Sequence, residues 1–409
     1  MSSLEFGDGP QSLYADSRLT TFDVTKARRE TPGTENVLHF NNAGAALMPL
    51  PVIEAVNRHL QLEAEIGGYE AAARAERTLS RIYDVAAKLL GGEAEEIAIV
   101  ENATRAWDMA FYAMKFSEGD RILTCQSEYA SNYIAYLQVA RKTGAVIEAA
   151  PNDPSGQIDV AALENMIDDR VKLISITHVP TNGGLVNPAS AVGRVAKAAG
   201  VPYLLDACQS VGQMPIDVGD IGCDILSVTG RKYLRGPRGT GMLWVRKELI
   251  PSLEPPFLDL HAAEWSGEQS YLVRPDARRF ENWESFVAGR AGLSSAMDYA
   301  MSWDLATSYA RVQALAESLR AKLGDLKGVT VQDLGVEKCG IVSFSKDGIE
   351  AAAVEEAMTA QGINVKASGV SSTRLDMIAR GLDDLVRASV HYYNTDEEVE
   401  RFCTAAEGV

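Results

Sequence analysis

Short apolar runs alternate with segments of helical period through most of the first 250 residues. Each apolar run is five to seven residues long, and such alternation is typical of an α/β fold in which helices cover a parallel sheet. Because a helix separates most successive runs, we expect right-handed crossovers and a mostly parallel seven-stranded sheet. The predicted strands are Glu96–Val100, Arg121–Cys125, Val146–Ala150, Val171–Thr177, Pro202–Asp206, Asp224–Val228 and Gly241–Val245, and the predicted helices are Thr104–Lys115, Asn132–Thr143, Val160–Asp168 and Pro188–Ala199.

The pattern breaks between about Ser252 and Glu284, where prolines, tryptophans and charges are mixed. We interpret this stretch as an excursion that links two domains. After it, the pattern predicts a long helical stretch and then a smaller α+β domain. We therefore predict an N-terminal arm (1–39), a large domain (40–286) and a small domain (287–409). The elements predicted after the break are helix 287–326, strands 329–333, 340–345, 364–367 and 385–389, helix 350–361 and a last helix from Asp396.

Composition narrows the class of protein. The 409 residues are 46% hydrophobic and 23% charged, which excludes a disordered chain, and the net charge is −17. A chain this acidic repels polyanions, so no nucleic-acid partner is expected. No stretch approaches the length of a membrane span, and the first residues lack the apolar region of a signal peptide, so we expect neither a membrane partner nor targeting.

Cysteine usage indicates the compartment. The five cysteines, Cys125, Cys208, Cys223, Cys339 and Cys403, are an odd number and widely spaced. This pattern favours a reducing cytoplasm, and it does not predict a zinc site or any other metal site.

The candidate chemistry centres on Lys232, in the turn SVTGRKYLRGPRGTG between two apolar runs. The turn is rich in groups that can hold an anion, and an amine held beside an anion is what a Schiff-base enzyme needs. The alternative is a solvated lysine in a basic loop. Upstream, Asp206 ends the apolar strand of VPYLLDACQS. A carboxylate there can keep a heterocyclic nitrogen protonated, or it can simply cap the next helix.

These motifs resemble the class V aminotransferase family of fold-type I pyridoxal phosphate (PLP) enzymes, from about Phe40 to the C-terminus. The resemblance implies a fold-type I PLP-transferase with a large and a small domain. It also implies that Lys232 forms the Schiff base with the cofactor and that Asp206 binds its ring nitrogen. The other cofactor contacts that it implies are Gln209 and Asn182 at the phenolic oxygen, and Ala103, Thr104, Thr229 and Arg231 at the phosphate.

The resemblance assigns further roles on the substrate side. Tyr129, in SEYASN, takes the position of a histidine that stacks on the cofactor ring in desulfurases, and its phenol could still donate a proton. Arg387, in LVRASVHYYNT, matches an arginine that grips the substrate carboxylate, although an interdomain salt bridge is its alternative. Asn42 and Ala43, in HFNNAGAALMP, match a segment that lines the substrate side.

Two departures from the family narrow the expected reaction. The loop KASGVSSTRLDMIARGLDD lacks the nucleophilic cysteine of desulfurases, so persulfide formation is not expected. The contact that a neighbouring subunit usually makes to the phosphate reads RFENWE here, which places Trp283 at that position. Together these segments most resemble the branch that holds isopenicillin N epimerase-like proteins and hercynylcysteine sulfoxide lyase.

We therefore expect an enzyme that joins an amino-acid substrate to the cofactor through a Schiff base, removes the α-proton and eliminates a β-sulfur group, with release of pyruvate and ammonia. The same residues could serve a transaminase or an epimerase. A non-enzymatic binding module is disfavoured because the candidate residues occur together. GPRGTG has the wrong order and place for a dinucleotide-binding loop. The resemblance also implies a homodimer with shared active sites, with 266–283 either reaching into the partner's site or packing over its own domain.

Overall fold

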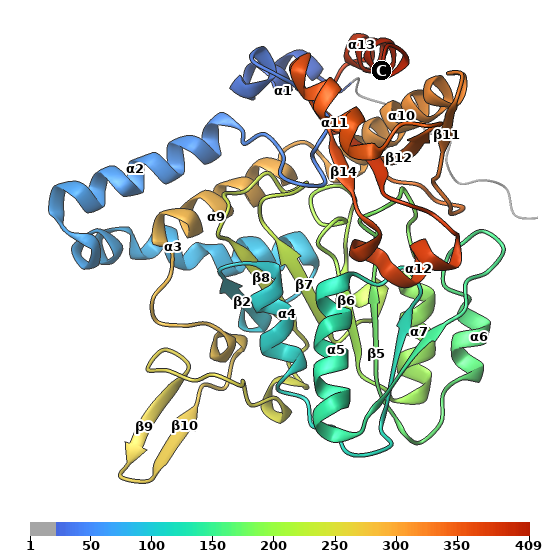
Figure 1. Cartoon of the computed structure of the whole chain (residues 1–409). Coiled ribbons are helices and arrows are strands. Elements are labelled where there is room, and N and C mark those ends of the chain that lie inside the picture. The colour runs from blue at the N-terminus through green and yellow to red at the C-terminus, as the bar shows by residue number, and fades with distance from the viewer. Residues whose placement is uncertain (1–21) are drawn as a thin grey trace, which may run out of the picture.

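The computed structural model describes residues 22–409, so residues 1–21 of the predicted arm lie outside the described residues. The described chain forms a large seven-stranded sheet and a separate four-stranded sheet, each with its own hydrophobic core. Figure 1 shows the two sheets one above the other, with helices around both. Across residues 22–409, no helix is both long enough and apolar enough to span a membrane.

The large sheet confirms the predicted fold class. Its strand order is β2-β8-β7-β6-β5-β3-β4, and all neighbours are parallel except β8, which runs antiparallel to both β2 and β7. The expected right-handed crossover is absent between β7 and β8, which a loop joins directly. The strands are β2 (Ile97–Val100), β3 (Arg121–Cys125), β4 (Val146–Ala150), β5 (Val171–Thr177), β6 (Tyr203–Asp206), β7 (Ile225–Thr229) and β8 (Gly241–Val245).

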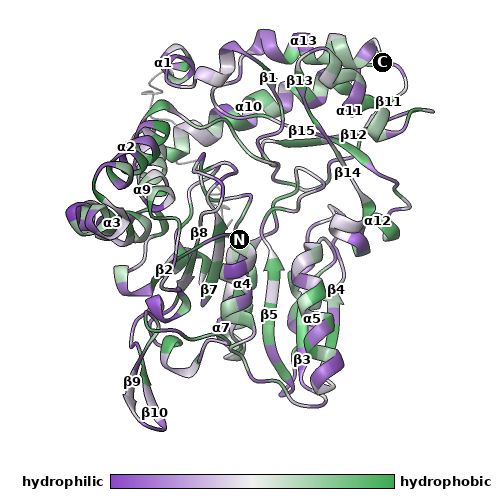
Figure 2. Cartoon of the chain, turned by 60° about the vertical axis from the view of Figure 1, so that its left-hand side comes forward, coloured by the Kyte–Doolittle hydropathy of each residue, from purple (hydrophilic) through white to green (hydrophobic). Residues whose placement is uncertain are grey.

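Helices cover both faces of this sheet because its strands are apolar on both sides. Trp107 and Phe111 of α4 and Tyr136 of α5 pack in the core of one face, and α3, α7 and α9 supply the core of the other face. Figure 2 shows the apolar colouring of the strands between these helices. The helices are α2 (Leu50–Ile66), α3 (Gly68–Leu90), α4 (Ala103–Phe111), α5 (Ala130–Thr143), α6 (Val160–Asn165), α7 (Ala189–Ala199), α8 (Val218–Ile221) and α9 (Val287–Met301).

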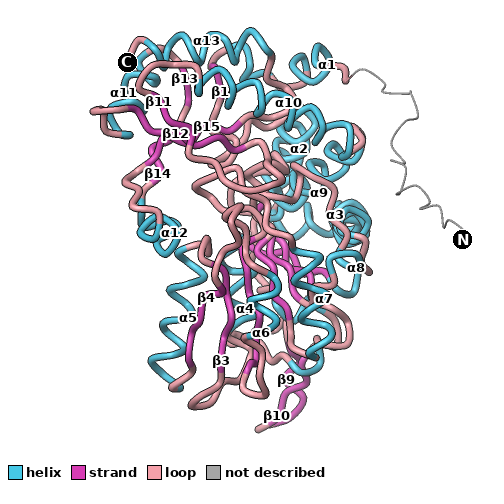
Figure 3. The backbone as a smooth tube through the Cα atoms, turned by 90° about the vertical axis from the view of Figure 1, so that its right-hand side faces the viewer, coloured by secondary structure: helices cyan, strands magenta, loops and turns pink. Residues whose placement is uncertain are grey.

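The small sheet is antiparallel, with the order β11-β12-β15-β14, and Figure 3 shows α10, α11 and α13 around it. Two predicted elements are divided in the structure. The stretch 287–326 breaks at Asp304, which caps the second helix, and the strand at 364–367 is two short strands. The elements are α10 (Leu305–Gly324), β11 (Val329–Val331), β12 (Ile341–Lys346), α11 (Ala351–Ala360), β13 (Ile363–Asn364), β14 (Lys366–Ser368), α12 (Arg374–Ala379), β15 (Leu385–Ser389) and α13 (Asp396–Glu407).

The N-terminal segment packs on the small sheet, although it precedes the large one in the chain. Helix α1 (Val24–Arg29) adds Ala27 to the small core, and β1 (Leu38–His39) pairs with β13. Conversely, α9 packs against α2 and α3 and adds Leu293 and Met297 to the large core. The division into 1–39, 40–286 and 287–409 stays a prediction. These contacts show that helices from one predicted unit pack in the hydrophobic core of another.

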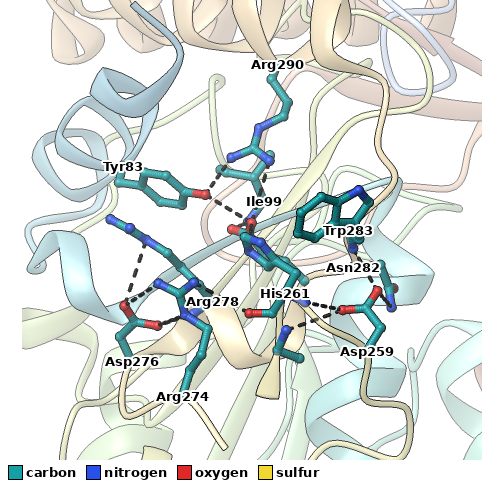
Figure 4. A network of polar contacts seen from close by, with 12 residues as sticks. Tyr83, Ile99, Asp259, His261, Arg274, Asp276, Arg278, Asn282, Trp283 and Arg290 are labelled. Atoms are coloured by element: carbon teal, nitrogen blue, oxygen red, sulfur yellow. Dashed lines mark hydrogen bonds and ion pairs between the residues drawn. The ribbon is translucent and has the colours of Figure 1, made fainter. Parts of the chain in front are cut away.

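The excursion after β8 forms a hairpin that projects from the body, made of β9 (Ala263–Gly267) and β10 (Ser270–Val273). The chain then returns to its own large sheet at the buried Glu281. This carboxylate accepts hydrogen bonds from the Ile99 amide at 2.7 Å and from the Tyr83 hydroxyl at 3.0 Å, and His261 lies 3.1 Å away (Figure 4). The end of the excursion is therefore fixed to its own chain, and whether the hairpin also reaches a partner stays a prediction.

Candidate active site

A cavity of about 310 Å³ opens where the parallel strands β5, β6 and β7 end. This carboxyl edge is where α/β sheets bind ligands. Helix α4 begins at the same edge, and the loop between β7 and β8 forms another wall. The lining residues are Glu101, Asn102, Ala103, Thr104, Tyr129, Asn132, Thr177, Val179, Thr181, Asp206, Cys208, Gln209, Thr229, Arg231, Lys232, Arg238, Gly239 and Thr240.

Lys232 lies on the loop 230–240, which joins two antiparallel strands and so turns sharply at the edge of the sheet. The pKa of Lys232 is lowered to about 8, mainly because burial removes its amine from water; nearby Arg231 and Arg387 act in the same direction, while Asp206 opposes them. A lysine with this pKa is partly neutral at pH 7 to 8. It can therefore act as a nucleophile or as a base, which the free residue cannot do efficiently at that pH.

Asp206 is held at the end of β6 by two donors. Its Oδ1 accepts the amide of Cys208 at 2.9 Å, and its Oδ2 accepts the side-chain amide of Asn132 at 3.0 Å. The same Asn132 nitrogen donates to Glu128 at 2.9 Å. Glu128 and Asn132 are absent from the sequence prediction, although both lie close to Tyr129, Glu128 just before the residue that caps α5 and Asn132 in its first turn.

Glu128 is a buried carboxylate behind the cavity wall. It also accepts the amide of Tyr129 at 2.8 Å and the hydroxyls of Thr177 at 2.5 Å and Thr124 at 2.8 Å. The pKa of Glu128 is raised to about 7, mainly by burial and also by the nearby charge of Asp206, while these hydrogen bonds lower it. Glu128 therefore positions both the residue that starts α5 and the asparagine that holds Asp206.

The side chains of Gln209 and Asn182 differ in whether all their polar atoms have hydrogen-bond partners. The Gln209 Nε2 donates to the carbonyl of Ala43 at 3.1 Å, but its Oε1 is buried without a partner within the described chain. Asn182 does not line the cavity. Its amide donates to the carbonyl of Gly369 at 3.2 Å and accepts the hydroxyl of Ser368, so it ties the large sheet to the small one.

The predicted anion end is assembled from two segments. The amides of Ala103 and Thr104 lie in the first turn of α4, and the Asn102 side chain caps that helix through the amide of Arg105. Across from them, Arg231 donates to the Thr229 hydroxyl at 2.9 Å. Four predicted phosphate residues, Ala103, Thr104, Thr229 and Arg231, thus line one cavity. A helix N-terminus beside a guanidinium is a favourable place for a phosphate.

Glycine 241 lets the first turn of α4 approach the sheet. A Cβ at Gly241 would lie 2.7 Å from the carbonyl carbon of Asn102 and 3.0 Å from the nitrogen of Ala103. A side chain there would push the helix start out of place, and the anion end with it.

Arg387 lies on β15 of the small sheet and reaches toward the large sheet. Its Nη1 donates to the Thr181 hydroxyl at 2.7 Å, and its Nη2 donates to Asn41 at 3.3 Å. Its Nε is buried without a partner within the described chain. The salt bridge that was the alternative for Arg387 is not among the ion pairs of residues 22–409, so the guanidinium remains available to an anion next to Thr181.

Besides Asn182 and Arg387, which do not line the cavity, three more predicted residues lie away from its lining. Asn42 is buried between the Ser389 carbonyl, to which it donates at 2.7 Å, and the Tyr393 hydroxyl. Ala43 donates its amide to the Ser389 hydroxyl at 2.9 Å. Trp283 has 59% of its surface exposed, and its backbone amide is bonded to Asp259. Within this one chain, the structure does not bring Trp283 to the cavity.

The residues present fit pyridoxal phosphate. An amine and a carboxylate share one cavity with a helix N-terminus and a guanidinium, and these match the cofactor's aldehyde, ring nitrogen and phosphate. Lys232 would hold the cofactor covalently, and Asp206 would bind the ring nitrogen. When bound, the group would supply an electron sink beside Lys232.

Comparison with known proteins gives the family. The family model described as "Aminotransferase class-V" matches residues 38–402. A "Probable cysteine desulfurase" of Xylella fastidiosa strain Temecula1 is 31% identical over 382 residues, which cover 90% of each chain. The apo cysteine desulfurase from Thermococcus onnurineus NA1 has a TM-score of 0.87 and 26% identity, over 95% of this chain and 98% of that one. The cystine C–S lyase C-DES, solved with its product cysteine persulfide, has a TM-score of 0.83 and 22% identity, over 92% and 99%.

Proposed function

The chain belongs to the class-V aminotransferase family, and on that premise we propose that it is a carbon–sulfur β-lyase that acts on a cysteine S-conjugate or sulfoxide. Pyridoxal phosphate is the cofactor of this family. The observation that carries the proposal is a cavity that joins Lys232 and Asp206 but offers no reactive thiol. The names of the relatives place sulfur chemistry of cysteine in the same family.

The overall reaction balances without an oxidant or reductant. A cysteine S-conjugate and one water give a thiol, pyruvate and ammonium. The Cα–H and Cβ–S bonds break, and the sulfur leaves with the electron pair of the Cβ–S bond. Hydrolysis of the remaining enamine gives the keto acid and ammonium. Bound pyridoxal phosphate would accept the charge left at Cα after the proton is removed.

Four side chains would move protons or bind the reactants in this reaction. The neutral Lys232 amine takes the α-proton, which its lowered pKa permits near neutral pH. Asp206 keeps the proton on the ring nitrogen, and Asn132 holds Asp206 in place. Arg387 binds the substrate carboxylate through donors that Thr181 does not occupy. Tyr129 donates a proton to the leaving sulfur.

Persulfide formation would need a thiolate close to the substrate sulfur. Cys125, Cys223, Cys339 and Cys403 are buried and do not line the cavity, and the segment 366–384 contains no cysteine. Cys208 does line the cavity, but burial raises its pKa well above the ordinary value, with Asp206 adding to the effect. It therefore stays a neutral thiol, and elimination into water is the favoured outcome.

The proposal includes a homodimer. Four large apolar side chains are exposed on the segment 257–286, at Phe257, Leu260, Trp283 and Phe286. A second chain packed on this segment would remove them from water. A second chain seated there would bring Trp283 near the anion end of one site or the other, and light scattering of the purified protein measures the mass that decides the point.

The test is a pair of substrate panels on the purified, cofactor-loaded chain. Cysteine S-conjugates and sulfoxides are assayed for pyruvate, and amino donors with keto acids are assayed for amino transfer, with Lys232→Ala as the control. The proposal expects pyruvate from the first panel only, lost in the variant. Amino transfer alone would establish a transaminase, and exchange of solvent deuterium at Cα without net turnover would establish an epimerase.

A further inference from the structure

Arg235 has an unusual backbone conformation three residues after Lys232. Its φ is +62°, and among residues 22–409 the other non-glycine with positive φ is Asp304. A long side chain in the left-handed region is uncommon, and such strain persists only where the surroundings hold it. Arg235 is also 1% exposed, so a buried cation occupies a strained position in the loop that carries the lysine.

The guanidinium of Arg235 contacts four separate parts of the chain. Its donors reach the Thr31 hydroxyl at 2.6 Å, the Leu47 carbonyl at 2.8 Å and the Tyr392 hydroxyl at 2.8 Å. The rings of Tyr393 and Tyr299 lie 4.6 and 5.6 Å from its central carbon.

None of the ion pairs among residues 22–409 includes Arg235. Its charge is held by neutral acceptors and aromatic faces, which stabilise a guanidinium better than an ammonium.

The backbone around Lys232 is fixed on both sides. The carbonyl of Arg231 accepts a hydrogen bond from the amide of Ala46 at 2.9 Å, and the carbonyl of Tyr233 accepts one from Nε2 of His391 at 2.9 Å. The carbonyl of Lys232 itself accepts the amide of Arg235 at 2.8 Å. Three successive carbonyls are thus bonded, and the amide that holds the middle one belongs to the strained residue.

We propose that Arg235 is a positioning residue that fixes the Lys232 amine in the cavity by clamping its loop to the N-terminal segment and to the small domain. The inference rests on the proposed function of Lys232 and deepens it. Without the clamp, the turn from Lys232 to Arg235 loses its outer support, because the guanidinium is what ties it to Thr31, Leu47 and Tyr392. The lysine would then reach the aldehyde of the cofactor less often, and its amine would meet more water.

Two variants separate the clamp from the backbone strain. Arg235→Asn removes the guanidinium but suits the left-handed conformation, because asparagine adopts it more readily than most residues. Arg235→Lys keeps the charge and the strain but cannot reach three acceptors at once. Arg279→Lys is the matched control, because Arg279 is also a buried arginine, donates to the carbonyls of Ile250 and Leu253, and lies outside the cavity lining.

The first readout does not need the cofactor. The full-length chain is acylated with acetic anhydride across a pH series, and the modified peptide that contains Lys232 is quantified by mass spectrometry. In Arg235→Asn we expect the pH midpoint of Lys232 acylation to rise by about one unit, because a better hydrated amine is more basic. Arg235→Lys should show a smaller rise, and Arg279→Lys should match the unchanged chain.

The second readout is the rate at which pyridoxal phosphate attaches to Lys232, followed by absorbance and trapped with borohydride. We expect a loss of about tenfold or more in Arg235→Asn, because small misplacements of a reacting group are costly. Partial recovery in Arg235→Lys would support the clamp. The proposed clamp would be overturned if the acylation midpoint and the attachment rate change no more than they do in Arg279→Lys. If Arg235→Asn does not fold, the same comparison is made with Arg235→Lys alone.

The two readouts also separate this inference from the function on which it rests. If the unchanged chain attaches no pyridoxal phosphate at Lys232, the proposed function fails, while the acylation midpoint still shows whether Arg235 positions the amine.

Discussion

The side-chain amide of Asn132 lies 3.0 Å from Oδ2 of Asp206, and the same nitrogen lies 2.9 Å from Glu128. One asparagine thus bridges the carboxylate expected to face the cofactor ring and a second, buried carboxylate. The bridge comes from α5, and Asp206 comes from β6, so the geometry of the site depends on how this helix packs on the sheet.

Glu128→Gln should remove most of a pH dependence in stability. Burial raises the Glu128 pKa from about 4.5 to about 7, so the folded chain holds a proton that the unfolded chain releases. The unchanged chain should therefore lose up to about 3 kcal/mol relative to Glu128→Gln as the pH rises from about 4.5 to 7. Urea unfolding at pH 5 and pH 8 measures this difference. Equal differences at both pH values would show that Glu128 stays ionised in the fold.

Arg387→Lys should impair substrate binding more than it impairs stability. An ammonium cannot donate to Thr181 and to a carboxylate in the forked geometry of a guanidinium. We expect kcat/KM to fall by about 10² or more, mainly through KM.

Arg311→Lys is the matched control, since Arg311 donates to the carbonyls of Tyr392 and Asn394 away from the cavity. Similar kinetics for the two variants would remove Arg387 from the substrate site.

Tyr129→Phe should slow release of poor leaving groups in particular. The phenol is proposed to protonate the departing sulfur, and general acid catalysis is typically worth 10² to 10⁴ in rate. With an alkyl thiol as the leaving group, we expect kcat/KM to fall by about 10²-fold. With a nitrophenyl thiol we expect almost no change in kcat/KM, because that sulfur leaves as a stable anion. Parallel kcat/KM measurements on the two substrates make the comparison. An equal loss for both would indicate that Tyr129 only stacks on the ring.

Cys208→Ala should still release pyruvate from cysteine conjugates. The thiol is neutral near pH 7 because burial raises its pKa, so it is not expected to accept sulfur. Mass spectrometry of the unchanged chain during turnover should find no persulfide on Cys208. A Cys208 persulfide that forms during turnover, together with loss of sulfur release in the variant, would instead support a desulfurase.

Much of the large sheet could be predicted from the sequence. The limits of the apolar runs 121–125, 146–150, 171–177 and 241–245 coincide with strands, because strands covered by helices on both faces are apolar along most of their length. Strand direction could not be predicted in the same way. The apolar run at 241–245 does not indicate in which direction its strand runs, so its antiparallel pairing with β7 could not be predicted.

The candidate site shows the same limits. Lys232, Asp206, Gln209 and Tyr129 were found from motifs, and the structure brings them to one cavity. Asn42 and Ala43 also come from a motif, but backbone and side-chain hydrogen bonds within the fold occupy them.

Two supporting residues were missed for physical reasons. Glu128 is a carboxylate next to the end of a predicted strand, and polar residues there are ordinarily exposed. The left-handed backbone of Arg235 leaves no trace in the sequence, because that conformation is usual for glycine. The sequence predicts a loop at 374–379, where the structure has a short helix, because six residues show too little periodicity.

The measurement that tests the account most directly is the product stoichiometry from one cysteine S-conjugate in one sample of the cofactor-loaded chain. The account predicts thiol, pyruvate and ammonia in equal amounts, all lost in Lys232→Ala. Alanine with transferred sulfur and no pyruvate would contradict it and indicate desulfuration. A sulfur-containing keto acid with the carbon–sulfur bond intact would contradict it as well and indicate a transaminase.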